Sequence, residues 1–479
     1  MNDPNGLVYF NGVYHLYFQY NPEGNDWGNM SWGHASSTDL VHWTEHPVAI
    51  LCDDNEAIYS GSVVVDHHNS AGFGEDDVTP FVAIYTSAFA DGRQAQSLAY
   101  SLDEGTTWTK YSRNPVLERN STAFRDPKVF WFQADQGPGY WVLVAVEAVG
   151  KKVVLYRSVD LRDWVHLSDF GPTDEEGGLW ECPDLFRLPV DGAAAEAKWV
   201  LVVSRDPGRS TQGSFAQYYI GDFDGTNFAS ADDRVPRRLD WGRDYYAAVS
   251  FDNVPHGRRI LLGWMSNWNY AATVPTAPWR GTMSLPREIS LRNVDGEIAL
   301  FQRAAAEINA LRARAENHSI RPFTVEGSRP IEGSPMYRLD VSFEPVDARA
   351  IGLDLLVGDD HATRVRYDTK TGLLSLDRRR SGSTDFESSF ASIETVPIRL
   401  IDGVLRLEVY VDRGSVEVFA QDGEVSITDQ VFAPEWCTGL SIVSSGGATW
   451  VQHLNLEKFP DARAAAKDPD DIAMTSEVA

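Results

Sequence analysis

The chain has 479 residues, of which 43% are hydrophobic and 11% aromatic. Such a length predicts several domains, or a large domain with a smaller one, and the apolar content is enough to build their cores. The 69 acidic residues outnumber the 42 basic ones and give a formal net charge of −27, which argues against nucleic acid and an anionic membrane surface as partners.

Three cysteines, Cys52, Cys182 and Cys437, lie far apart in the sequence. This spacing fits neither a disulfide framework nor a zinc site with close Cys/His pairs, so we expect no metal and no cofactor. No apolar run reaches the roughly 18–20 residues of a membrane span. The start of the chain has neither the basic end nor the apolar core of a signal peptide. We therefore expect a soluble protein, extracellular if residues are missing before Met1 and cytoplasmic otherwise.

Strand signals dominate the first 300 residues. Short runs rich in Val, Ile, Tyr, Phe and Trp are bounded by Gly, Asn, Asp and Pro, and helical periodicity is missing. In chain order the predicted strands include Leu7–Phe10, Val13–Tyr20, Gly61–Asp66, Phe81–Thr86, Lys128–Phe132, Trp141–Val146 and Val153–Ser158. The Asn-Gly pair at positions 11 and 12 predicts a tight hairpin turn between the first two.

A short repeat punctuates these strands. A Ser-x-Asp-Leu motif precedes Trp43 and recurs before Trp164, a looser version ends at Trp108, and a fourth ends at Phe228. The closing aromatics are about 60 residues apart with about four strand signals in each unit, which is typical of the four-stranded blades of a β-propeller. Residues 1–300 therefore predict a five-bladed propeller, with unrelated hairpins in a sandwich as the alternative.

Acidic residues recur at the opening strand of several units. Asp3 and Asp126 each precede a proline and a strand, and Glu181 opens a variant of the same segment. Because the innermost strands of a propeller run side by side along its channel, we expect these three carboxylates to meet at one mouth. The alternative is that each acid caps its own turn, since Asp before Pro is ordinary turn chemistry.

The texture changes near Phe301. A linker helix is predicted over 301–320, with Ile308, Leu311 and Ala315 on one face. Over 321–460 alternating strands indicate a β-sandwich domain, and residues 461–479 a polar tail. The predicted strands of the sandwich are Tyr337–Phe343, Ile351–Val357, Thr363–Asp368, Leu373–Asp377, Val404–Val411, Ser415–Ala420, Leu440–Ser444 and Thr449–Leu456. The expected fold class is all-β.

At the three acidic segments the sequence resembles glycoside hydrolase family 32, the β-fructosidases. The motifs of this family stand in order at Asn2–Gly6, Arg125–Pro127 and Glu181–Pro183. Further matching segments are Phe18–Pro22, Trp32–Ala35, Tyr59–Ser62, Leu262–Trp268, Pro278–Gly281 and Leu285–Glu288. The family fold, a five-bladed propeller followed by a β-sandwich, agrees with the independent reading of the repeat.

The resemblance implies a catalytic role for each acid. Asp3 would be the nucleophile, Glu181 the general acid/base, and Asp126 would hydrogen-bond the fructose hydroxyls. Arg125 would hold the sugar and balance local negative charge. Three acids in one pocket repel each other, so we expect at least one raised pKa, with Glu181 as the natural candidate.

The resemblance also implies a sugar-binding role for residues around the acids. Asn2, Gln19, Trp27, Ser60 and Trp279 match positions that line the fructose subsite. For the two tryptophans alone, a place in the blade core is the competing interpretation.

Two further residues stand beside the acids. Cys182 is expected to support the site by packing or hydrogen bonding. For Asp184, a role as sugar ligand or as turn cap stays open.

The expected function is the release of terminal fructosyl units from fructans, levan or inulin, and from sucrose. The local sequence around residues 56–62 and 94–101 resembles bacterial levanases and exo-inulinases more than dedicated invertases. A sucrose-preferring invertase, a fructosyltransferase and a non-catalytic carbohydrate-binding propeller are the alternatives. A metal-dependent hydrolase is disfavoured, because His67 and His68 are adjacent and no His-Glu-x-x-His motif occurs. The expected partner is the sugar substrate, with no nucleic acid and no membrane, and the oligomeric state stays open.

Overall fold

The computed structural model describes residues 1–75, 78–134, 137–173, 178–208, 212–230 and 236–460. The chain divides into two compact units. The first unit comprises Met1–Glu307 together with Gly423–Asp429, and the second comprises Ile308–Asp422 and the chain from Gln430 onward. No helix among the described residues is long and apolar enough to cross a membrane.

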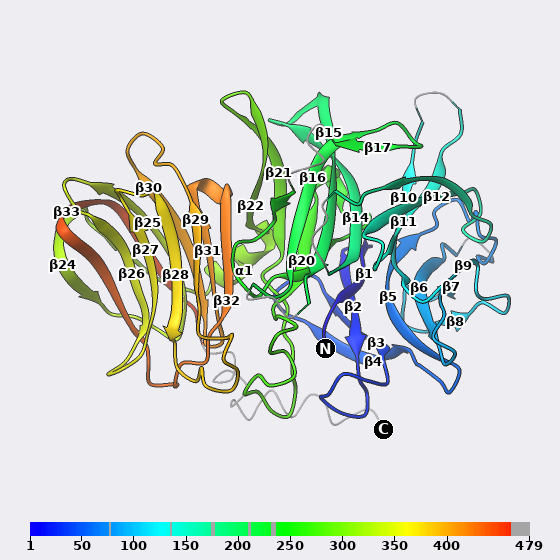
Figure 1. Cartoon of the computed structure of the whole chain (residues 1–479), viewed down its shortest axis with the longest axis horizontal. Helices are drawn as coiled ribbons and strands as arrows, with labels where there is room; N and C mark the ends of the chain where they lie inside the picture. Colours follow the sequence, from blue (N-terminus) through cyan, green and yellow to red (C-terminus); the bar gives the residue numbers. More distant parts are fainter. Residues whose placement is uncertain (76–77, 135–136, 174–177, 209–211, 231–235, 461–479) are drawn as a thin grey trace. The chain divides into compact units, whose positions relative to one another are not determined.

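The first unit is a propeller of five antiparallel blades (Figure 1). Blade 1 contains β1 (Pro4–Phe10), β2 (Val13–Tyr20), β3 (Ser31–Ser37) and β4 (Thr44–Ile50). Blade 2 contains β5 (Glu56–Val65), β6 (Phe81–Phe89), β7 (Gln94–Ser101), β8 (Thr109–Lys110) and β9 (Leu117–Ser121). Blade 3 contains β10 (Phe124–Phe132), β11 (Tyr140–Glu147), β12 (Lys152–Ser158) and β13 (Val165–Phe170).

Blades 4 and 5 share one continuous sheet. Blade 4 contains β14 (Leu179–Val190), β15 (Ala193–Asp206), β16 (Phe215–Phe223), β17 (Phe228–Ser230) and β18 (Arg237–Arg238). Blade 5 contains β19 (Tyr246–Ser250), the 3₁₀ turn η1 (Pro255–Gly257), β20 (Ile260–Trp264), β21 (Arg287–Val294) and β22 (Glu297–Ala304). A parallel bridge between Val190 and Leu291 joins the two blades. The seven strands predicted in this unit are confirmed, with β2 at its predicted bounds.

The Ser-x-Asp-Leu repeat forms the turn into the outer strand of a blade. In blade 1 a carboxylate oxygen of Asp39 accepts hydrogen bonds from the amides of Val41 (3.0 Å) and His42 (2.8 Å). The indole of Trp43 then donates to the carbonyl of Leu40 at 3.2 Å and closes the turn. Blade 3 repeats the arrangement with Asp160, Trp164 and Leu161. The repeat is therefore a local hydrogen-bonding device, since short Asp and Ser side chains readily satisfy turn amides.

The second unit is an antiparallel β-sandwich (Figure 1). Its strands are β23 (Glu316–Ile320), β24 (Phe323–Ile331), β25 (Met336–Pro345), β26 (Ala350–Val357), β27 (Ala362–Asp368), β28 (Leu373–Arg380), β29 (Ile393–Pro397), β30 (Leu405–Asp412), β31 (Ser415–Ala420) and β33 (Gly439–Lys458). The strand β32 (Val425–Gln430) lies, apart from Gln430, in the segment Gly423–Asp429 of the first unit. The two strands predicted at Leu440–Ser444 and Thr449–Leu456 are one strand, β33, which pairs first with β26 and then with β25. Gly446 and Gly447, with φ of 69° and 146°, lie between these two stretches. Glycine accepts such backbone angles at little cost, so the strand bends there without ending.

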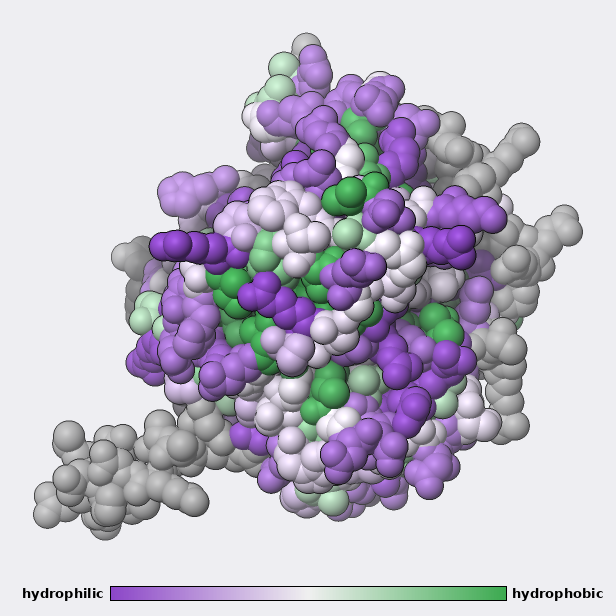
Figure 2. All heavy atoms as spheres, turned by 90° about the vertical axis from the view of Figure 1, so that its left-hand side faces the viewer, coloured by the Kyte–Doolittle hydropathy of each residue, from purple (hydrophilic) through white to green (hydrophobic). Residues whose placement is uncertain are grey.

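The remaining helical elements are short. They are η2 (Ala306–Ile308), α1 (Asn309–Arg312) and η3 (Gln421–Gly423). Over residues 301–320, where the sequence predicts a linker helix, the structure has the end of β22, this one helical turn and β23. On the face of the second unit drawn in Figure 2, hydrophobic side chains gather near the middle and are interrupted by hydrophilic ones.

Candidate active site

The three predicted acids lie at the beginnings of innermost strands from three blades. Asp3 directly precedes β1, Asp126 stands near the start of β10 and Glu181 near the start of β14. Each of these strands carries a register shift near its start, and so do β5 and β19. A β-bulge re-aims the side chains beside it, and bulges are common next to active sites. All five innermost strands thus have a β-bulge near their start, which turns side chains away from the regular strand pairing.

Cys182 lies between the acids. Its amide donates to Oδ2 of Asp126 at 3.0 Å, and its thiol sulfur lies 3.7 Å from Oδ2 of Asp126 and 3.7 Å from Oδ2 of Asp3. Asp126 and Cys182 both adopt left-handed backbone angles, with φ of 62° and 48°. The register therefore aligns Cys182 with Asp126 and places Glu181 at the level of Arg125. The three acids therefore converge as expected, and Glu181 stands one position before the site of Asp126, as its variant motif Glu-Cys-Pro implies.

Asp3 is held by two side chains from its surroundings. Ser60 Oγ donates to Asp3 Oδ2 at 2.7 Å, and Asn2 Nδ2 donates to Asp3 Oδ1 at 3.0 Å. Gln19 fixes the backbone, because its amide donates to the Asp3 carbonyl at 3.0 Å. Its side-chain amide donates to the carbonyl of Ile58, so Gln19 links the first and second blades. Three of the predicted sugar-binding residues therefore also orient Asp3.

Glu181 accepts hydrogen bonds from the guanidinium of Arg125 and from the hydroxyl of Tyr246. Arg125 approaches Glu181 Oε1 with Nε at 3.2 Å and Nη2 at 2.9 Å, and Gln94 Oε1 lies 3.4 Å from the same guanidinium. Tyr246, on β19, donates its hydroxyl to Glu181 Oε2. No sequence motif marks Tyr246. The available signal was its place at the start of the fifth blade's opening strand, where the other blades carry their motifs.

Burial and mutual repulsion shift the proton affinities of this site. The pKa of Asp126 is raised to about 7, chiefly by burial, with the charges of Glu181 and Asp3 adding and Arg125 opposing. The pKa of Asp3 is also raised, by burial and by the charge of Glu181, against the hydrogen bonds from Ser60 and Asn2. A raised pKa was expected for at least one acid, and Asp3 and Asp126 fulfil that expectation. Burial and the nearby carboxylates raise the pKa of the Cys182 thiol as well, which argues against a thiolate nucleophile.

The two predicted tryptophans are exposed rather than part of a blade core. Trp27 is 60% exposed and Trp279 58% exposed. The ring of Trp27 packs edge-on against that of Tyr59, with the ring centroids 5.9 Å apart. Tyr59 directly precedes Ser60 in the sequence. The loops that carry the two tryptophans are joined by an ion pair of 2.7 Å between Asp26 and Arg280, and the Met1 ammonium donates to the Arg280 carbonyl. Both indoles thus belong to loops tied to the acidic segment.

Asp184 is buried and serves the framework. Its carboxylate accepts the amide of Ser250 at 2.6 Å and lies 3.8 Å from Nζ of Lys128, which is buried as well. Lys128 and Asp184 directly follow the Arg-Asp-Pro and Glu-Cys-Pro motifs of β10 and β14, so this pair ties the two strands together beside the acids. No group of three or more His, Cys, Asp or Glu side chains within the described part of the chain could hold a metal ion.

Comparisons with known proteins agree with this geometry. The model of the glycosyl hydrolases family 32 N-terminal domain matches residues 1–303, and that of the family 32 C-terminal domain matches residues 307–458. The chain belongs to glycoside hydrolase family 32. It is therefore a glycoside hydrolase, and the all-β fold of propeller and sandwich is that of its family.

Several relatives resemble the chain over most of its length. A levanase of Bacillus subtilis is 41% identical over 95% of this chain and 68% of the relative, and an extracellular exo-inulinase of Aspergillus niger is 40% identical over 94% and 90%. The crystal structure of exo-inulinase from Aspergillus awamori matches with a TM-score of 0.90 at 37% identity, covering 96% of both chains. A β-fructofuranosidase from Schwanniomyces occidentalis, complexed with fructosyl-erythritol, gives a TM-score of 0.86 at 31% identity over 96% and 95%.

Proposed function

We propose that this family 32 hydrolase releases terminal β-D-fructofuranosyl units from fructans such as levan and inulin, and from sucrose. The observation that carries the proposal is the gathering of Asp3, Asp126 and Glu181 around Cys182. Relatives named levanase, exo-inulinase and β-fructofuranosidase support the same class of substrate. The two exposed tryptophans offer apolar walls beside these carboxylates, as sugar sites require.

Hydrolysis would proceed by double displacement. Asp3 attacks the anomeric carbon of the fructosyl unit, and the bond to the leaving oxygen breaks as Glu181 donates a proton to that oxygen. Water then attacks the same carbon, Glu181 takes its proton, and the carboxylate of Asp3 is released. The hydrogen bonds from Ser60 and Asn2 hold Asp3 in one orientation for the attack.

Asp126 would bind the fructose rather than react with it. Its Oδ2 accepts the Cys182 amide, while Oδ1 has no hydrogen-bond partner among the residues that the structure describes. With a pKa near 7, its carboxyl holds a proton below neutral pH and can donate to a sugar hydroxyl. Arg125 stays paired with Glu181 and balances the charge of the site.

The deciding experiment incubates the protein with levan, inulin and sucrose and resolves the products. We expect free fructose from both polymers and fructose with glucose from sucrose. Shorter fructan oligomers as main products would contradict terminal release, new linkages would indicate transfer, and sucrose cleaved far faster than both polymers would indicate an invertase.

Two substitutions test the assigned roles. Asp3→Asn should abolish turnover while the fold survives, and Glu181→Gln should lower kcat about 10²- to 10⁴-fold, the usual worth of general acid–base catalysis. Asp91→Asn, at an exposed carboxyl in the turn after β6, is the matched control and should keep full activity. Normal activity of the Asp3 variant would remove it as the nucleophile.

A further inference from the structure

A hollow lies between blades 3 and 4, at the end of their strands opposite the three acids. It has a volume of about 380 Å³, within the range of small-molecule sites. Asp126 stands at the start of β10, whereas Phe132, at the end of β10, lines this hollow. Six residues of strand separate them, which corresponds to about 20 Å. The hollow is therefore distinct from the active site.

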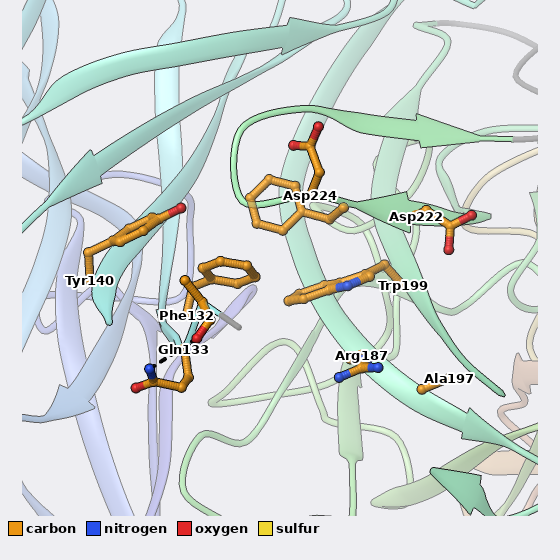
Figure 3. A pocket seen from close by; sticks show the side chains of 10 residues that line it. Phe132, Gln133, Tyr140, Arg187, Ala197, Trp199, Asp222 and Asp224 are labelled. Carbon is orange, nitrogen blue, oxygen red and sulfur yellow. Dashed lines mark hydrogen bonds between the residues drawn. The ribbon is translucent and has the colours of Figure 1, made fainter. Parts of the chain in front are cut away.

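Aromatic rings form one wall of the hollow (Figure 3). The ring of Trp199 lies 5.1 Å from that of Phe223 and 6.0 Å from that of Phe132, and Phe132 lies 5.4 Å from Tyr140. Tyr140 is fixed by a hydrogen bond of 2.8 Å from its hydroxyl to the carbonyl of Gly225. The rings pack against one another, so the wall is held in place before any ligand arrives.

Polar groups stand around this wall. Arg187 and Trp199 are direct partners on β14 and β15, so their side chains lie next to each other on one face of the sheet. Arg187 is exposed, and within the described part of the chain its guanidinium forms no hydrogen bond or ion pair. Asp224 uses Oδ1 to accept the amides of Thr226 and Asn227, and the Asn227 side chain also hydrogen-bonds this carboxylate. A carboxylate has about four lone-pair sites, so Asp224 keeps acceptor capacity. A donor and an acceptor are therefore available beside the aromatic wall.

We propose that this hollow is a second binding site for the fructan chain, built from Trp199, Phe132, Arg187 and Asp224. Sugar rings present apolar C–H faces and hydroxyl edges, which suit an aromatic wall with polar groups at its rim. Asp222 is paired with Lys198 at 2.9 Å, so an anionic ligand would meet chiefly Asp224 and the net charge of −27. A purely apolar ligand would leave the polar rim unsatisfied. A neutral polysaccharide fits both constraints.

The inference rests on the proposed function, and it adds a distinction between substrates. Sucrose is too short to reach both sites at once. A fructan polymer held at the hollow keeps its other units close to the enzyme, which raises their effective concentration at the active site. The hollow should therefore matter for levan or inulin and have no influence on sucrose.

Kinetics with polymeric and short substrates test this distinction. Arg187→Ala removes an exposed side chain with little risk to the fold, and Trp199→Ala removes the stacking surface. We expect each to raise KM for the polymer about 3- to 10-fold while kcat and KM for sucrose stay unchanged. Arg321→Ala and Trp436→Ala, at exposed positions outside the hollow, are matched controls and should behave as the wild type. Unchanged polymer kinetics in both hollow variants would overturn the inference.

Direct binding separates this inference from the proposed function. In a native gel containing levan or inulin, the Asp3→Asn protein should be retarded, and Asp3→Asn combined with Arg187→Ala or Trp199→Ala should migrate faster. Trp199-dependent retardation would support the hollow even if the wild type hydrolysed no fructan. Retardation that is unchanged by both substitutions would overturn the inference about the hollow, even if hydrolysis is normal. Equal Trp199-dependent retardation in a dextran gel would overturn the assignment to fructan.

Discussion

The backbone at Cys182 organises the site at the scale of single residues. Its left-handed φ of 48° lets the amide point at Asp126 while the thiol contacts Asp3. Non-glycine residues rarely adopt this angle, and when they do they cluster where function requires it. The supporting role predicted for Cys182 from the sequence thus has a physical form, an amide and a sulfur between two carboxylates.

Asp126 should make the stability of the protein depend on pH. Its pKa is about 7 in the folded protein and near 3.8 when unfolded, so the folded state binds more protons between these values. Stability contributed by protonated Asp126 is therefore present at pH 4 and lost as pH rises through 7. We expect Asp126→Asn to gain stability over the wild type at pH 8 relative to pH 4.5, measured by chemical denaturation. Parallel profiles for the two proteins would contradict the raised pKa.

The identities of the acids followed from sequence, whereas the environment of individual residues did not. Asp184 could be read as a sugar ligand or a turn cap, and only its burial against Lys128 and Ser250 decides for the framework. Tyr246 comes from another blade, 65 residues from Glu181, and carries none of the motifs. Contacts of this range depend on the closure of the propeller, which a linear pattern does not contain.

At the scale of elements, the bulge in β5 depends on Gly61. A Cβ placed there would lie 2.2 Å from the carbonyl oxygen of Ile84, which is far inside contact distance. Gly61→Ala must push β5 away from β6 and displace Ser60, the hydrogen-bond donor to Asp3. We expect a loss of about 1–3 kcal/mol in unfolding free energy, as for other overpacked sites, and a lower kcat.

Gly150→Ala is the matched control for this substitution. Its nearest neighbouring atom is 3.5 Å from the new Cβ, an ordinary contact distance. Thermal unfolding and fructose release measured on both variants separate crowding at Gly61 from the general effect of adding a methyl group. Wild-type stability and activity of Gly61→Ala would show that β5 can shift without affecting Ser60.

Blade 1 contains a buried stack of histidines that should respond to acid. Nδ1 of His15 and Nε2 of His34 are 3.2 Å apart, and the His34 ring stacks on the rings of Tyr17 and His46. Burial, with repulsion from neighbouring histidines, lowers the pKa of His15 to about 4 and that of His34 to about 3. The unfolded chain binds these protons near pH 6.5, so stability is lost as pH falls from 6.5 towards 4.

Replacing His34 should reduce this loss of unfolding free energy in acid. His34→Phe keeps an aromatic ring beside Tyr17 and removes one titrating group, so its unfolding free energy should fall less between pH 6.5 and pH 4 than that of the wild type. His453→Phe, at a half-exposed histidine of the second unit, should leave the slope unchanged. Equal slopes for the wild type and His34→Phe would contradict the role of the stack.

The strands themselves were largely predictable, and the bends within them were not. Runs such as Val13–Tyr20 are set by local apolar composition and flanking turn residues, which a sequence shows directly. The two predicted strands within Gly439–Lys458 are a single strand, because glycines allow a bend that the pattern presents as a break. Bulges depend on pairing with the neighbouring strand and carry no comparable signal.

At the scale of the whole molecule, the boundary of the first unit is discontinuous. The segment Gly423–Asp429 belongs to it, where the Thr428 hydroxyl and the guanidinium of Arg287 both contact Asp240. Arg287 is fully buried, and a buried guanidinium must be paired. The sequence alone suggests one division of the chain near residue 300. The ion pair between Arg287 and Asp240 joins residues far apart in the sequence, and no sequence pattern indicates it.

The net charge of −27 should have little influence on catalysis, because the proposed substrate is neutral. Charge accelerates encounters only with charged ligands, and salt abolishes that steering as the screening length falls from about 30 Å at 0.01 M to about 3 Å at 1 M. The acids of the active site are buried or paired with Arg125, so added salt reaches them little. We expect kcat/KM for sucrose and for levan to change by less than about twofold over this range of salt. A steep fall of kcat/KM with added salt would show that the enzyme recognises a charged group on its substrate. That result would count against a neutral fructan as the ligand.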